Sequence, residues 1–227
     1  MDSLAALPEG IAAERRDAVV VVTMDRGENR LHPRLLSGLE SILDAVERDD
    51  APTALVLTGS GKFFSNGLDL EYMAANPEEA EAILARVHAL YGRLLGLGVP
   101  TVAAINGHAF AGGAMLALSC DLAVMRSDRG YFCLPEADLG LPFTPGMNAL
   151  LTARLSPPTA HRAMVTGHRF TGTEALAAGI VTDIAPEHEV LDRAVALAAG
   201  LAAKSRPAVA AIKRGMYGDV IGALAPA

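Results

Sequence analysis

Some segments of the sequence hold residue types that often serve phosphate, nucleotide or acyl-transfer chemistry, and their spacing decides whether they could do so here. The run Gly59-Ser60-Gly61-Lys62 follows an apolar stretch, but a phosphate-binding P-loop would need glycine at position 56, where the chain has Val56. A dinucleotide-binding fingerprint would need glycine at position 64, where the chain has Phe64. No serine lies in a G-x-S-x-G turn. The spacing therefore argues against all three kinds of site.

A metal site is not predicted, because the residues that could bind a metal do not cluster. His188-Glu189 lacks the second histidine of a zinc-binding helix motif, and the six histidines are scattered along the chain. Cys120 and Cys133 also lack the spacing of metal ligands. Each cysteine is expected to be a buried thiol in a reducing compartment.

Two glycine-containing segments could instead present backbone N–H groups. Asn66-Gly67 has the composition of a tight turn, and Gly112-Gly113 stands where a small-residue helix would begin. Backbone N–H groups at such positions can hold a negatively charged oxygen, and the N-terminal end of a helix adds a positive dipole. Taken singly, each segment has a plainer interpretation, as a turn or as tight packing of a helix on a strand.

The elements that must position these segments alternate between apolar strands and amphipathic helices. Strands are predicted over Ala18–Met24, Ala54–Thr58, Thr101–Ile105, Leu122–Met125 and Tyr131–Cys133. Helices are predicted at 33–46 with Pro33 in the first turn, at 76–95 from Asn76, after Gly112, from Pro157, from Thr171 with Glu174 in a capping box, and at 190–201. The tail, 222–227, is expected to fray. This order predicts a layered α/β fold with parallel strands.

Composition narrows the class of protein further. A chain of 227 residues is long enough for one sizeable core, so a single domain over 1–227 is predicted. The formal charge of −7 argues against a nucleic-acid partner, which needs a basic surface. No apolar run reaches the ~20 residues of a membrane helix, and no signal peptide is evident at the N-terminus. A cytoplasmic protein without a membrane partner is expected.

Taken in order, the glycine segments and their neighbours resemble the crotonase superfamily, the enoyl-CoA hydratases and isomerases. The family's F-x-x-G-x-D-[LI] loop is similar to Phe64-Ser65-Asn66-Gly67-Leu68-Asp69-Leu70. Its N-G-x-x-x-G-G-G segment resembles Asn106-Gly107-His108-Ala109-Phe110-Ala111-Gly112-Gly113, followed by the family's C-D pair at Cys120-Asp121. Pro135-Glu136 and 171–175 match as well, so the similarity spans Val19 to Lys213.

The resemblance implies a fold, an assembly and a backbone oxyanion hole. The fold would be a spiral of ββα units over about 1–155, followed by a helical trimerisation region over about 156–227. Relatives generally form homotrimers or dimers of trimers. The N–H groups of Leu68 and Gly112 would hold the thioester oxygen of an acyl-CoA as an enolate forms, with Gly67 shaping the turn and Gly113 allowing close approach.

The number of catalytic carboxylates that this sequence shares with the family favours one reaction. Hydratases of this family use two glutamates, and the first of these positions is Met115 here, whereas the second is Glu136. One carboxylate suffices to move a double bond, because it can take a proton from C2 and return it to C4. The chain therefore looks most similar to the single-glutamate Δ3-Δ2-enoyl-CoA isomerases. An apolar neighbour such as Met115 would raise the pKa of Glu136.

Other polar residues near these motifs have weaker claims. Asp138 lies two residues after Glu136 and would share its face in an extended segment, so it is a possible second acid. Asp69 is expected to cap or pin its loop, and Asp121 to anchor a helix end. His108 is more simply a packing or surface residue.

The resemblance also suggests where coenzyme A would bind, with no cofactor other than this thioester substrate. The adenine would meet the backbone of 62–66, which includes Lys62, Phe64, Ser65 and Asn66, with Lys62 a possible phosphate ligand. The acyl tail would contact Leu70, Met73, Leu141 and Phe143. Basic residues of the last helix, Lys213 and Arg214, together with Tyr217, are further candidates for the CoA phosphates.

Three functions remain open at this point. The leading prediction is an isomerase that converts 3-enoyl-CoA to 2-enoyl-CoA through Glu136. The alternatives are hydration or another crotonase reaction such as thioester hydrolysis, and an acyl-CoA-binding protein with little catalysis.

Overall fold

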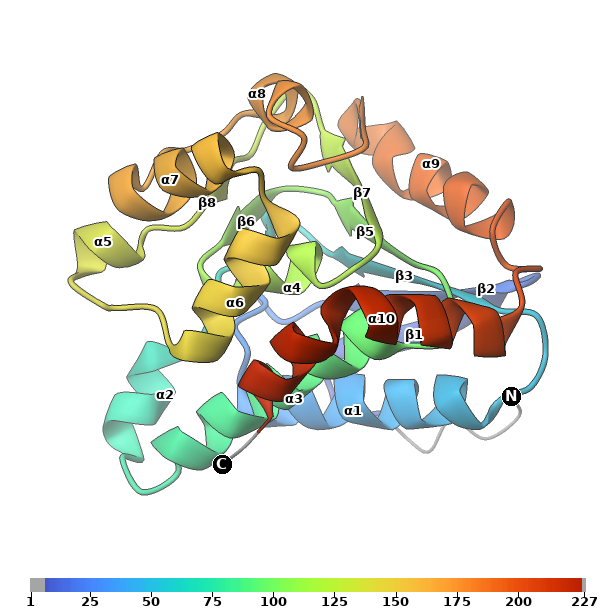
Figure 1. The fold of residues 1–227 in the computed structure, drawn as a ribbon, viewed down its shortest axis with the longest axis horizontal. Coiled ribbons are helices and arrows are strands. Elements are labelled where there is room, and N and C mark those ends of the chain that lie inside the picture. The colour runs from blue at the N-terminus through green and yellow to red at the C-terminus, as the bar shows by residue number, and fades with distance from the viewer. Residues whose placement is uncertain (1–6, 226–227) are drawn as a thin grey trace.

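The computed structural model describes residues 7–225, and within this range a six-stranded sheet forms the centre of the molecule (Figure 1). Its strands follow the order β1-β2-β3-β5-β7-β9, with bounds β1 (Ile11–Arg16), β2 (Val19–Met24), β3 (Ala54–Gly59), β5 (Thr101–Ile105), β7 (Leu122–Arg126) and β9 (Asp183–Ala185). All neighbours pair in parallel except β1 and β2, which are antiparallel. The predicted parallel α/β fold is confirmed.

The central strands are buried on both faces, which explains their unbroken apolar sequences. Every residue of β3 and β5 is buried, as expected for a parallel sheet that helices cover on both sides. β1 was not predicted, because half of its sequence, IAAERR, is charged and its side chains are mostly exposed. It forms the edge of the sheet, where an exposed face is tolerated.

A second, small sheet contains the motif segments. Its order is β4-β6-β8, all parallel, with β4 (Phe63–Ser65), β6 (His108–Phe110) and β8 (Phe132–Cys133). Each of these strands follows a strand of the large sheet and leads to a helix, which gives the repeated ββα unit of the predicted spiral. The two- and three-residue strands are too short to produce an alternation that sequence inspection could recognise.

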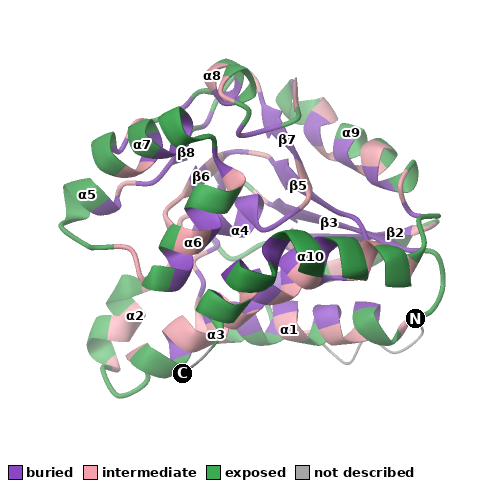
Figure 2. Cartoon of the chain, viewed as in Figure 1, coloured by how far each residue is buried: buried purple, intermediate pink, exposed green. Residues whose placement is uncertain are grey.

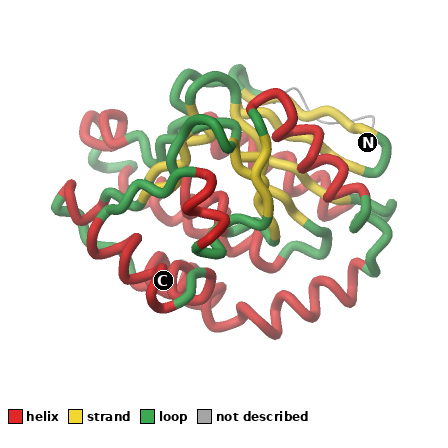
Figure 3. Tube along the Cα trace, turned by 90° about the horizontal axis from the view of Figure 1, so that it is seen from above, coloured by secondary structure: helices red, strands yellow, loops and turns green. Residues whose placement is uncertain are grey.

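Helices cover both faces of the large sheet (Figures 1 and 3). One layer is formed by α9 (Glu187–Ala199), which packs on alternate residues of the strands, including Val19, Val56 and Val102. The opposite residues, such as Val20 and Leu55, face the main core beneath α1 (Pro33–Arg48) and α3 (Ala80–Gly96). Figure 2 shows buried residues concentrated on the strands and on the inner faces of these helices.

The remaining helices are shorter, except for the last. They are α2 (Leu70–Ala75), α4 (Gly112–Leu118), α5 (Glu136–Leu139), α6 (Pro145–Arg154), α7 (Pro157–Thr166), α8 (Gly172–Ala177) and α10 (Arg206–Leu224). The capping box of α8 is present as predicted. Asn76 was expected to start a helix, but it ends α2, and α3 begins only at Ala80. No helix among residues 7–225 is long and apolar enough to cross a membrane.

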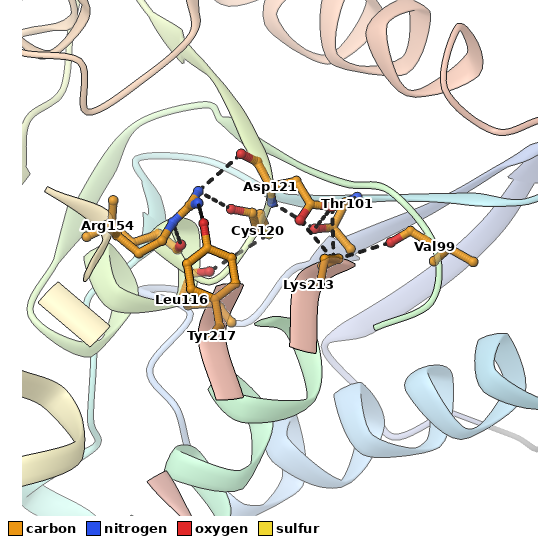
Figure 4. Close-up of polar contacts among 9 residues, drawn as sticks. Val99, Thr101, Leu116, Cys120, Asp121, Arg154, Lys213 and Tyr217 are labelled. Carbon is orange, nitrogen blue, oxygen red and sulfur yellow. Dashed lines mark hydrogen bonds and ion pairs between the residues drawn. The ribbon is translucent and has the colours of Figure 1, made fainter. Parts of the chain in front are cut away.

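A buried polar network fastens α10 to the rest of the fold (Figure 4). The Lys213 ammonium lies 2.8 Å from an Asp121 carboxylate oxygen, and Asp121 also accepts hydrogen bonds from the N–H and hydroxyl of Thr101. Arg154 donates to the hydroxyl of Tyr217 at 2.6 Å. Lys213 and Tyr217 are only 5% and 8% exposed, so the prediction that they meet CoA phosphates is wrong for this chain. Arg214 is exposed.

The end of the chain is more ordered than was expected. Gly222 to Leu224 belong to α10, and the Leu224 side chain is buried, so the prediction of fraying is wrong for this part. The last two residues of the predicted frayed tail, 226–227, lie outside the described residues.

Substitution of Lys213 tests whether this residue is structural. Lys213→Met keeps the apolar stem but leaves Asp121 without its cation, so we expect a loss of ~1–3 kcal/mol in the free energy of unfolding. Urea denaturation measures this loss. The KM for an acyl-CoA should stay within about twofold of wild type. A large rise in KM with unchanged stability would restore the phosphate-binding role.

Candidate active site

The loop after β4 and the start of α4 meet through backbone atoms. Gly67 has φ +82°, a left-handed conformation that favours glycine, and a Cβ placed on it would lie 2.9 Å from the Gly112 nitrogen. The Gly67 carbonyl accepts a hydrogen bond of 2.7 Å from the Leu31 N–H, which fixes this peptide. A side chain at position 67 would therefore push the two segments apart.

The start of α4 is held in an unusual backbone conformation. Ala111 has φ 51° and ψ −123°, which a residue with a Cβ adopts only at a cost of ~1–3 kcal/mol. Its N–H donates to the Cys133 carbonyl at 3.0 Å, and its carbonyl accepts from the Met115 N–H at 3.1 Å. The next turn packs tightly on β4, since a Cβ on Gly113 would lie 2.2 Å from the Ser65 carbonyl oxygen.

This arrangement leaves two backbone donors without partners. Within residues 7–225, neither the Leu68 N–H nor the Gly112 N–H donates a hydrogen bond to another protein group. Gly112 opens α4, so its N–H lies at the positive end of the helix. Leu68 follows Gly67, which contacts the Gly112 nitrogen, so the two N–H groups belong to neighbouring segments.

Glu136 is the buried carboxylate of this region. It is the first residue of α5 and only 7% exposed, and its Oε2 atom has no hydrogen-bond partner among the described residues. Burial raises its pKa from 4.5 to about 7, and a hydrogen bond from its own backbone N–H opposes the rise only in part. Such a carboxyl exists in both protonation states near neutral pH, as a proton-transfer group requires.

Asp138 does not share the environment of Glu136. The segment is helical rather than extended, so positions two apart point to different sides of α5. Asp138 is exposed, and its carboxylate faces Gly167 at the end of α7. The prediction that the two acids share a face is therefore wrong, and no neighbouring charge contributes to the raised pKa of Glu136.

Met115, from α4, and Tyr91, from α3, are both buried. Met115, where hydratases of the family have a glutamate, is 1% exposed and belongs to the main hydrophobic core. Tyr91, from α3, is fully buried, and its hydroxyl donates a 2.7 Å hydrogen bond to the Gly112 carbonyl. Burial raises the pKa of Tyr91, and the charge of Glu136 adds to this rise, so the two side chains are electrostatic neighbours.

Sequence inspection missed Tyr91, because it occupies an apolar position of α3 and reads as a core residue. The only available signal was its hydroxyl group, since a buried tyrosine needs a hydrogen-bond partner. The partner here is the backbone of the helix that carries a candidate oxyanion donor.

Several of the other predicted ligand residues have structural roles. The Phe64 side chain is fully buried, so it cannot touch a ligand and only its backbone could contribute. Ser65 is also fully buried, its hydroxyl donating to the Asn29 carbonyl, and Asn66 donates to Glu28. Asp69 caps α2 by accepting from the Tyr72 N–H at 3.2 Å, as expected.

The remaining predicted ligand residues lie at the surface or on the core margin. Lys62, Leu70 and Leu141 are exposed, while Met73 and Phe143 pack partly against the core. Among the described residues, no three His, Cys, Asp or Glu side chains gather as a metal site would require.

The raised pKa of Glu136 makes stability depend on pH. The folded chain binds this proton more tightly than the unfolded chain, so the stabilisation is complete below the ordinary value of 4.5 and is lost as pH rises through about 7. Glu136→Gln removes this group and should be more stable than wild type at about pH 8, by ~2–3 kcal/mol. Urea unfolding of both proteins from about pH 5 to 8 measures the difference. Parallel pH profiles would contradict the buried, raised-pKa assignment.

Comparison with known proteins places the chain in a family. The enoyl-CoA hydratase/isomerase family model matches residues 14–224. The chain is 35% identical to the peroxisomal enoyl-CoA delta isomerase 2 of Arabidopsis thaliana over 93% of each chain. It is 32% identical to the 2,3-dehydroadipyl-CoA hydratase of Escherichia coli K12, covering 91% of this chain and 81% of that protein.

A solved structure agrees with this placement. An enoyl-CoA isomerase of Mycobacterium tuberculosis superposes with a TM-score of 0.88 at 31% identity, covering 95% of this chain and 94% of that one. A second structure of the same protein is described as a probable enoyl-CoA hydratase. Family model, sequence relatives and fold agree: this chain is a member of the enoyl-CoA hydratase/isomerase family.

Proposed function

We propose that this protein moves the double bond of a 3-enoyl-CoA to the 2-position. The observation that carries the proposal is one buried carboxyl, Glu136, whose pKa is raised to about 7. Its charge acts on Tyr91, whose hydroxyl is bonded to the carbonyl of Gly112, and the N–H groups of Gly112 and Leu68 have no partner among the described residues. The relatives named as delta isomerases support the same reaction, although relatives named as hydratases match as well.

The reaction would use these groups in two proton transfers. Ionised Glu136 takes a proton from C2 of the acyl chain, and the electrons of the C–H bond move into the thioester, whose oxygen becomes negative. The N–H groups of Leu68 and Gly112 hold this oxygen. Each such donor contributes ~10²–10³ in rate in comparable enzymes. Protonated Glu136 then returns the proton to C4, and the double bond ends between C2 and C3.

Hydration is the second candidate, and the geometry disfavours it. Adding water requires a group to hold and activate the water besides the group that delivers the proton. Met115 supplies no such group, and Asp138 faces away from Glu136 at the surface.

A homotrimer or dimer of trimers and a cytoplasmic location remain predictions from the sequence.

The proposed reaction can be tested with two substrates. The purified protein is incubated with 3-enoyl-CoA and, separately, with 2-enoyl-CoA, and conjugation and hydration are followed by absorbance. We expect conversion of 3-enoyl-CoA to 2-enoyl-CoA with no 3-hydroxyacyl product. The rate should rise as pH passes through about 7, because the base must be ionised.

Two carboxyl variants serve as a matched pair in this assay. Glu136→Gln should lose nearly all activity, at least roughly 10³-fold, whereas Asp138→Asn should stay close to wild type. Rapid hydration of 2-enoyl-CoA by the wild type would instead support a hydratase. Acyl-CoA binding without turnover of either substrate would support a different crotonase reaction or a binding protein.

Tyr91 gives a further prediction for the same reaction, as a positioning residue. Gly112-Gly113 is a flexible pair, and the Tyr91 hydroxyl restrains the peptide that joins them. Tyr91→Phe should lower kcat roughly tenfold, less than the loss of a donor itself, with KM within about twofold of wild type. The control is Tyr217→Phe, which removes another buried tyrosine hydroxyl, bonded to Arg154. Equal losses in both variants would point to general destabilisation.

A further inference from the structure

A small polar cavity lies at the other end of the short strands from Glu136. It forms where the chain passes from the large sheet into β4, β6 and β8, whereas the candidate active site lies where these strands end. Its volume is about 220 Å³. The residues around it are Gly61, Lys62, Gly107, His108, Arg126, Arg129, Gly130 and Glu187.

The cavity wall is built from turns in direct contact. A Cβ on Gly107 would lie 2.1 Å from the Lys62 carbonyl oxygen, and that carbonyl accepts the His108 N–H at 3.0 Å. The turns before β4 and β6 are thus joined backbone to backbone. The backbones of Lys62 and His108 are therefore held next to each other.

Positive charge collects around this cavity in a chain whose formal charge is −7. Arg126 is balanced, since it pairs with Asp128 at 2.9 Å and with Glu187 at 2.7 Å. Lys62 and Arg129 also line the cavity, and within residues 7–225 neither forms an ion pair with a carboxylate. Lys62 and Arg129 thus add positive charge beyond what the two carboxylates on Arg126 balance, and a bound anion would offset the repulsion between these cations.

Arg169 adds to the same excess of positive charge. Its guanidinium lies over the Phe110 ring, 5.9 Å from the ring centre, and it too has no carboxylate partner among the described residues. Lys62, Arg126, Arg129 and Arg169 all act to lower the pKa of His108, after burial, the largest cause. Arg169 therefore contributes to the field at the cavity although it is not in its wall.

His108 brings a buried polar atom without a partner. Its ring lies between those of Phe63, Phe110 and Tyr131, with centres 5.3, 4.9 and 5.6 Å away. Its Nδ1 atom is buried and makes no hydrogen bond with a described residue. These rings hold the imidazole in place at the cavity wall, where a neutral imidazole can still donate one N–H.

We propose that this cavity binds a small tetrahedral oxyanion, of which inorganic phosphate is the simplest example. Lys62, Arg129 and His108 supply donors, while Glu187 stays paired with Arg126 at the wall. The volume is below the ~300–1,000 Å³ of pockets that enclose a drug-sized ligand, yet several times the ~30 Å³ of a water molecule. The site does not depend on the function proposed above.

The test measures phosphate binding by ³¹P NMR titration and calorimetry, with chloride added to keep ionic strength constant. Wild type should show saturable binding at one site. Arg129→Gln and Arg169→Gln should each weaken it, the former by roughly tenfold for one lost charge-assisted contact. Arg48→Gln, which removes an exposed arginine of α1, is the control and should bind within about twofold of wild type.

A thermal unfolding series separates specific binding from the general effect of phosphate. Phosphate stabilises many proteins because it is excluded from their surfaces, and that part should persist in Arg129→Gln. Wild type and Arg48→Gln should gain more thermal stability from phosphate than Arg129→Gln does. This additional gain measures binding at the proposed site. Non-saturable binding, or equal binding by Arg129→Gln and Arg48→Gln, would overturn the proposal.

Coenzyme A itself carries phosphate, so a competition experiment distinguishes the two sources. Saturating acyl-CoA should leave the binding of inorganic phosphate unchanged, because the cavity and the candidate active site lie at opposite ends of the short strands. Displacement of phosphate by acyl-CoA would overturn a separate site and assign the cavity to the phosphates of coenzyme A.

Discussion

The contact between Gly67 and Gly112 is the constraint on which the candidate site depends. Gly67 lies in the loop after β4, and Gly112 is the first residue of α4. A Cβ on Gly67 would lie 2.9 Å from the Gly112 nitrogen, so only backbone fits between them. Because the segments touch there, the N–H groups of Leu68 and Gly112, which have no partner among the described residues, lie on neighbouring segments. The strands β3 and β5 of the large sheet set where each of these segments begins, and the strands β4 and β6 of the small sheet set where it ends.

Desolvation is the second physical effect that shapes the site. Among the described residues no cation stabilises the charge of Glu136, and burial moves its pKa to about 7. Other buried charged side chains, unlike Glu136, are paired with opposite charges. Lys213 is paired with Asp121, and Arg126 is paired with two acids. An unpaired buried carboxyl costs stability, and a chain keeps such a group where its reactivity is useful.

Much of this arrangement could be predicted from the sequence, and the failures have clear physical causes. The amphipathic pattern of α1 could be recognised because this helix buries one face. The apolar runs of β2, β3 and β5 could be recognised because these strands are buried on both faces. The edge strand β1 and the short α2 carry no such pattern. The order of the glycine-containing segments also identified Gly67 and Gly112 correctly as a pair of interest. Their backbones are in close contact, and only glycine fits at such a contact.

The errors concern side chains whose surroundings are set by packing at a distance. Asp138 was placed beside Glu136 on the assumption of an extended segment, whereas the chain turns into α5 there. Lys213 reads as a surface lysine until α10 packs against α3 and α6 and buries it. Tyr91 gains its role from a partner 21 residues away in sequence.

Ala111 has a consequence for how the donor at Gly112 behaves over time. At φ 51° an alanine is in a conformation that costs energy, so other contacts must hold the backbone there. Hydrogen bonds to Cys133 and from Met115 hold the population on the side that presents the N–H. The backbone conformation that leaves the Gly112 N–H without a protein partner among the described residues therefore depends on β8 as well as on α4.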